Sequence, residues 1–157
     1  MTEGRCDETE EERADRNFAD LLQELRVAQT GVQILFAFLL TIPLQARFEK
    51  LNQWQVDVFV AALLFSALAT ACLIAPVAYH RVLFRQRLKD YIVRTASRFA
   101  VAGLLFLGLA VVSSVHLVLD IVLNRTVAFW VAGALGALLI LIWWLMPLSR
   151  RAQRNRG

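Results

Sequence analysis

The fold is decided by one uninterrupted apolar stretch, residues 99–119, which reads FAVAGLLFLGLAVVSSVHLVL. It contains no Asp, Glu, Lys or Arg. A helix rises about 1.5 Å per residue and the hydrocarbon core of a bilayer is about 30 Å thick, so roughly 20 apolar residues can span it. Three further charge-free stretches of similar length occupy residues 27–46, 58–79 and 126–149. The sequence therefore predicts four transmembrane helices.

The composition favours a membrane protein over a soluble helical bundle. Of the 157 residues, 58% are hydrophobic, and the mean hydropathy is +0.54. A soluble four-helix bundle has apolar stripes with charged outer faces, whereas here the charges fall between the apolar stretches. We therefore predict an all-α fold, an antiparallel bundle of four transmembrane helices. The expected spans are about 27–46, 58–79, 99–119 and 126–148.

The segments outside the spans differ in charge. Residues 1–16 are rich in Asp and Glu and poor in aromatics, which is typical of a disordered acidic tail and unlike a secretory signal. The membrane domain is expected over 17–150, followed by a basic tail over 151–157. Residues 17–26 either continue the first span as one helix or lie on the membrane surface as a short amphipathic helix. The absence of Gly and Pro between 17 and 26 favours one continuous helix.

The distribution of Lys and Arg predicts the orientation of the spans. The N-terminal segment, the loop between spans two and three and the C-terminal segment together hold 14 basic residues, while the other two loops hold 3. Cytoplasmic loops carry an excess of Lys and Arg. We therefore expect a multi-pass protein of the plasma membrane with both termini in the cytoplasm.

The first span carries a polar helical face. Its members are Arg26, Gln29, Thr30 and Gln33. Because amides are costly in hydrocarbon, we expect this face to point at other helices. It is a candidate polar or ion path, although such amides more often cross-link neighbouring helices.

A second candidate polar or ion path lies at the C-terminal end of the third span, where His116 and Asp120 are four residues apart and share a helical face. Ionisable groups beside a span suggest a proton or ion path. The alternative is structural, with Asp120 capping the helix end or pairing with Arg125.

Six basic residues occupy the segment between spans two and three, where they are expected to contact anionic lipid headgroups. They are Arg81, Arg85, Arg87, Lys89, Arg94 and Arg98. A lipid-interacting scaffold is therefore a further possibility.

Several sequence motifs typical of catalytic, metal-binding and nucleotide-binding sites are absent. No span has an Asp or Glu near its middle, and HExxH, CxxC, GxSxG and a Gly-rich phosphate loop do not occur. The two histidines, His80 and His116, fall at opposite ends of their spans. We expect no enzymatic activity, no metal, no cofactor and no nucleic-acid partner. The expected partners are the bilayer, including anionic lipids, and a second copy of the chain or another membrane protein.

Two segments carry a family resemblance: ELRVAQTGVQILFAFLLTIP at residues 24–43 and APVAYHR at residues 75–81. They resemble an uncharacterised family of small four-span bacterial membrane proteins of the actinobacterial type. The resemblance covers roughly residues 16–150 and implies the same four-span plan without a mechanism. Some similar sequences carry a sodium/proton antiporter label. The sequence thus favours a structural or accessory membrane protein, with a small cation/proton antiporter or other small transporter as the alternative.

Overall fold

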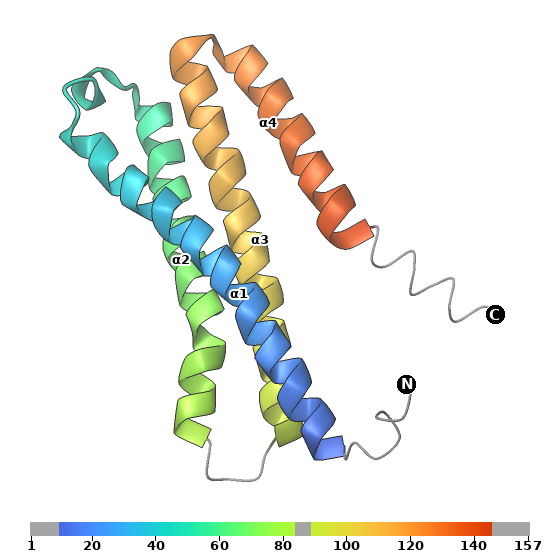
Figure 1. Ribbon diagram of the computed structural model, residues 1–157. Helices are drawn as coiled ribbons and strands as arrows, with labels where there is room; N and C mark the ends of the chain where they lie inside the picture. Colours follow the sequence, from blue (N-terminus) through green and yellow to red (C-terminus); the bar gives the residue numbers. More distant parts are fainter. Residues whose placement is uncertain (1–9, 84–88, 146–157) are drawn as a thin grey trace, which may run out of the picture.

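The computed structural model describes residues 10–83 and 89–145, which contain helices and connecting turns and no strand (Figure 1). The four long helices are α1 (Glu10–Thr41), α2 (Gln53–Leu83), α3 (Lys89–Val122) and α4 (Arg125–Ile140). Short 3-10 turns at Ile42–Leu44 and Phe48–Lys50 join α1 to α2, and a π-helical turn at Leu141–Leu145 extends α4.

Successive helices run in opposite directions (Figure 1). The α1–α2 connection and the α3–α4 turn lie at one end of the molecule, which we call the loop end. The start of α1, the last turn of α2 and the start of α3 lie at the opposite end. Each of the four helices contains a segment long and apolar enough to cross a membrane, and these segments are Leu22–Leu44, Gln53–Ala78, Thr95–Val122 and Arg125–Leu145. The predicted all-α, four-span fold is confirmed.

The first helix is longer than the sequence pattern predicted. It is continuous through residues 17–26 and begins at Glu10, inside the segment expected to be an acidic tail. Glu, Arg and Ala are strong helix formers, and acidic side chains interact favourably with the N-terminal end of the helix dipole. The helix therefore begins seven residues before residue 17, where the membrane domain was predicted to start, and the predicted domain boundary itself stays a prediction. Residues 1–9 and the predicted basic tail 151–157 lie outside the described residues.

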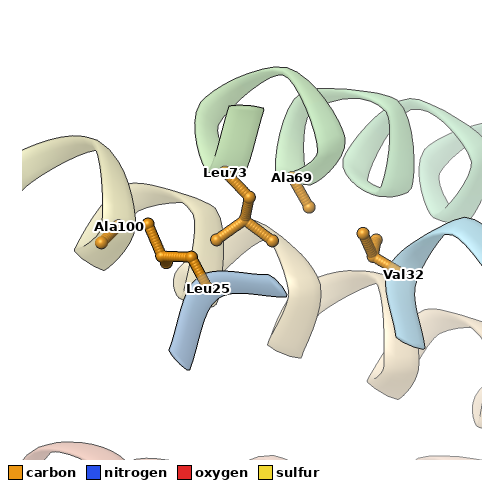
Figure 2. Close-up of a cluster of buried hydrophobic side chains, with 5 residues drawn as sticks. All are labelled: Leu25, Val32, Ala69, Leu73 and Ala100. Atoms are coloured by element: carbon orange, nitrogen blue, oxygen red, sulfur yellow. The ribbon is translucent and has the colours of Figure 1, made fainter. Parts of the chain in front are cut away.

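The centre of the bundle is the α2–α3 pair, which forms the most extensive helix contact. Helix α1 lies across this pair, and α4 packs along α3 (Figure 1). Two clusters of buried side chains hold the helices together. The first, shown in Figure 2, contains Leu25, Val32, Ala69, Leu73 and Ala100. The second, toward the loop end, contains Leu39, Phe59, Ala62 and Leu117.

Small residues set the spacing between α3 and its neighbours. A Cβ atom built on Gly103 of α3 would lie 2.7 Å from the side chain of Leu73 on α2, so only glycine fits at this contact. On α4 the buried residues are Ala128 and Ala132, and Gly136 faces Val112 of α3. These three small residues, spaced every four positions, thus lie on the side of α4 that packs on α3, as close helix approach requires.

Candidate functional site

Two titratable side chains are buried together at the loop end of α3. His116 is 6% exposed, and the side chain of Asp120, one helical turn further on, is 5% exposed. Their four-residue spacing puts both on the same side of α3. His116 and Asp120, the pair predicted from the sequence, therefore lie on one buried face of α3, near the end of the span Thr95–Val122.

Aromatic side chains from the neighbouring helices enclose His116. Its ring centroid lies 4.6 Å from that of Phe129 on α4 and 6.4 Å from that of Trp54 on α2. Trp54 and Phe129 also contact each other, with centroids 6.0 Å apart. The imidazole is thus held between two aromatic rings, and it joins α2, α3 and α4 at this end of the bundle.

In the part of the chain that the structure describes, Asp120 pairs with Arg125 at the start of α4. The Arg125 Nε atom lies 3.8 Å from Asp120 Oδ1, which is a long ion pair, and the Arg125 side chain is 52% exposed. The guanidinium carbon also lies 5.4 Å from the centroid of the Trp54 ring, within the range of a cation–π contact. The pairing with Arg125 considered in the sequence analysis is therefore present, in a partly solvated form.

One atom of each titratable side chain lacks a partner. Among the described residues, His116 Nε2 and Asp120 Oδ2 are buried and make no hydrogen bond. Buried polar atoms are usually bonded, so these two are available to a proton, a water or a small cation. An imidazole nitrogen and a carboxylate oxygen can exchange a proton. Within the described part of the chain, three or more His, Cys, Asp or Glu side chains do not gather as metal ligands would.

The structure divides the polar face predicted on the first span. The Gln29 Nε2 atom donates a hydrogen bond to the main-chain oxygen of Leu73 on α2, at 2.7 Å. Thr30 bonds only within its own helix, to the main-chain oxygen of Arg26 at 3.0 Å. Arg26, Thr30 and Gln33 are all exposed. Within one chain, therefore, only Gln29 of this face points at another helix, and the expectation is wrong there for the other three residues.

Three of these polar residues are exposed because a neighbouring apolar face of α1 packs against the other helices instead. Leu25, Val32 and Leu39 recur every seven residues and are buried against α2 and α3. Since this apolar stripe occupies the packed side of the helix, the neighbouring polar stripe is turned to the outside, and only Gln29 at its edge reaches inward. The two candidate groups do not meet, because Gln29 bonds to Leu73 on α2 and the other three residues are exposed, whereas the rings around His116 come from α2 and α4.

The structure describes the predicted lipid-contact residues only in part. Arg85 and Arg87 lie outside the described residues. Arg81 belongs to the last turn of α2, Lys89 and Arg94 lie in the first turns of α3, and Arg98 is exposed. Their contact with lipid headgroups stays a prediction.

Two members of the site, Trp54 and Phe129, were not predicted from the sequence. The pattern of either helix gives no signal that their rings meet His116, because the contact depends on how α2, α3 and α4 are placed around one another. The nearest signal was the position of Trp54 close to the start of a span, where amphipathic rings are common.

The chain was compared with known families, curated proteins and solved structures. A family described as a family of unknown function (DUF6328) matches residues 7–147. No curated protein matches the chain, and no solved structure does.

Proposed function

The chain belongs to this family of unknown function, and from that premise we propose that it is a non-enzymatic structural or accessory protein of the plasma membrane that acts by associating with a second copy of itself. Both termini lie in the cytoplasm in this proposal, as the excess of basic residues on that side favours. The observation that supports association is the position of one amide, Gln33.

Gln33 lies at the middle of a membrane span and faces outward. It is eleven residues after the first residue and eleven before the last residue of the segment Leu22–Leu44. Its side chain is exposed, and the described residues give its amide no hydrogen-bond partner. Hydrocarbon cannot satisfy an amide, so another helix packed against this face would stabilise it.

The exposed face around Gln33 has the spacing of a helix-packing surface. Positions 26, 30, 33, 37, 40 and 44 alternate steps of four and three residues, and all six are exposed. This 3.5-residue repeat is the one by which paired helices cross at a small left-handed angle. Thr30 and Ala37, the neighbours of Gln33 in this stripe, are small enough for close approach.

The chemistry of the amide favours a second copy as the partner. A glutamine side chain is both donor and acceptor, so two of them can pair with each other. A two-fold dimer brings a residue near the axis opposite its own copy. Gln33 of one protomer would then bond Gln33 of its partner at mid-depth in the bilayer.

This association can be tested by measuring energy transfer in liposomes. Full-length copies labelled with a donor are mixed with copies labelled with an acceptor over a series of protein-to-lipid ratios. Wild type is expected to dimerise, and Gln33→Leu should weaken the dimer several-fold, in line with about 0.6–1.7 kcal/mol for an interhelical hydrogen bond in a membrane. The control is Ile34→Ala, which alters a neighbouring exposed side chain outside the stripe. A monomeric wild type, or an unchanged Gln33→Leu dimer, would contradict the proposal.

A second candidate function is cation/proton exchange, which the two unpartnered atoms His116 Nε2 and Asp120 Oδ2 favour. Protein reconstituted in liposomes with a pH-sensitive dye should then show cation-dependent proton flux, and Asp120→Asn should abolish it. The matched control is Asp57→Asn, since Asp57 is exposed on α2 and bonds Gln53 at 2.8 Å. Absence of flux, or flux that Asp120→Asn leaves unchanged, removes this candidate.

A further inference from the structure

We propose that the loop end of the molecule holds a binding site for an amphiphile with an anionic head and a hydrocarbon tail. The site is a cavity of about 720 Å³ between the α1–α2 connection and the last turns of α3. Small-molecule sites typically occupy about 300–1,000 Å³. The cavity is separate from the His116 and Asp120 pair, and neither residue lines it.

The inner wall of the cavity is apolar. Leu117, Val118 and Ile121 of α3 contribute to it, together with Ile42 at the end of the first span. Leu117 is buried, whereas Val118 and Ile121 are exposed. All three belong to the membrane segment Thr95–Val122, so a hydrocarbon tail could lie along this wall and continue into the bilayer.

The rim of the cavity is cationic. Arg47 and Lys50, both on the α1–α2 connection, line it, and no Asp or Glu does. The two loops at this end of the molecule carry three basic residues in all, the third being Arg125. Two of the three therefore gather at one cavity, on the side of the protein where basic residues are scarce.

Three side-chain amides, those of Gln45, Asn52 and Gln55, also line the cavity and add further donors. Asn52 and Gln55 form a reciprocal cap at the start of α2, in which Gln55 N donates to Asn52 Oδ1 at 3.1 Å and Asn52 N donates to Gln55 Oε1 at 3.2 Å. Because each side-chain oxygen already accepts a main-chain hydrogen, the NH₂ groups are the parts left free. Both residues line the cavity, and their NH₂ groups can donate to a ligand there.

The arrangement selects the chemical class of the ligand. A guanidinium, an ammonium and three amide NH₂ groups favour a carboxylate or a phosphodiester, and charge-assisted hydrogen bonds to such groups are the stronger ones. The apolar wall favours a tail over a free inorganic anion. The two parts together fit a fatty acid or an anionic phospholipid.

Native mass spectrometry of the full-length protein, released from a neutral detergent, tests the site with four added probes: oleate, phosphatidylglycerol, oleyl alcohol and inorganic phosphate. Wild type is expected to bind at least one of the two anionic amphiphiles about tenfold more tightly than oleyl alcohol. Binding of oleate alone identifies a free fatty acid as the ligand, and binding of phosphatidylglycerol alone identifies a phospholipid. Equal binding of the alcohol, or equally tight binding of phosphate alone, overturns the proposal.

Variants locate the binding on the protein. The double variant Arg47→Gln/Lys50→Gln should lose the preference for the anionic head, and Val118→Trp should weaken binding of the tail. The matched control is Arg16→Gln, an exposed arginine near the start of α1, at the opposite end of the molecule, that should bind as wild type does. Unchanged binding by the double variant contradicts the site.

A photoreactive diazirine analogue of oleate provides a test that needs no variant. On wild-type protein it should label the segment 117–121 together with 42–52, as read by peptide mass spectrometry. Labelling that is spread over the four helices without enrichment there overturns the proposal.

Discussion

Gln29 on α1 donates a hydrogen bond from its side-chain Nε2 to the main-chain oxygen of Leu73 on α2, at 2.7 Å. Three residues after Leu73, Pro76 lies inside α2 and cannot provide the N–H that would bond the carbonyl of Cys72. In a membrane span, side chains of neighbouring helices often supply donors where proline interrupts the backbone ladder. The Gln29 bond therefore joins α1 to the turn of α2 that proline weakens.

Replacing Gln29 with leucine should remove this interhelical bond while keeping the volume of the side chain. We expect the free energy of unfolding to fall by about 1 kcal/mol, measured by circular dichroism during denaturation in mixed micelles under dilute, monomeric conditions. Gln33→Leu, the same change at an exposed position of α1, should leave the monomer's stability unchanged. Equal losses in the two variants would contradict the role of the Leu73 contact.

Replacing Gly103 with alanine should force α2 and α3 apart. The added Cβ would lie 2.7 Å from Leu73 Cγ and Cδ2 and 3.3 Å from its main-chain nitrogen, and Leu73 is fully buried. Overpacking of this kind costs about 1–3 kcal/mol, which the same denaturation experiment would detect. Gly133→Ala on α4 is the control, because no atom lies within 4 Å of its added Cβ. A Gly103→Ala variant as stable as Gly133→Ala would show that the helix contact adapts freely.

Asn124 should be a stabilising cap for α4. Its Oδ1 atom accepts a hydrogen bond from the main-chain nitrogen of Val127 at 3.0 Å, at the turn that joins α3 to α4. Asn124→Ala should lower the free energy of unfolding by about 1 kcal/mol, and Asn124→Ser should recover most of it, since serine also caps helices. Failure of serine to rescue would indicate that the turn depends on the amide for another contact.

The ion pair between Asp120 and Arg125 should contribute little to stability. The atoms are 3.8 Å apart and Arg125 is 52% exposed, so solvent screens the interaction. A double-mutant cycle with Asp120→Asn and Arg125→Gln should give a coupling free energy below about 1 kcal/mol. A coupling of several kcal/mol would mean that the pair is far more shielded from water than this geometry allows.

The four spans could be predicted from the sequence because membrane insertion depends on local length and hydropathy. The position of His116 and Asp120 on one face of a helix likewise follows from their spacing alone. Both properties belong to a single segment of the chain. They need no knowledge of how the segments pack.

The rotation of α1 about its own axis could not be predicted in the same way. The first span has an apolar stripe through Val32 and a polar stripe through Gln33, and either could have faced the bundle. The choice depends on the surfaces that α2 and α3 offer, such as the buried Leu73 and Ala69. Contacts between helices, such as that of Trp54 with His116, cannot be predicted from the sequence for the same reason.

The packing of α4 has a consequence for biogenesis. Apart from the side-chain contacts of Trp54 with α4 residues, the described part of α4 brings its backbone close to that of α3 alone among the other three long helices. We therefore expect α1 to α3 to assemble as soon as they leave the translocation machinery, without waiting for the last segment to be synthesised. The fourth helix would then dock on α3 as a separate step in the maturation of the protein.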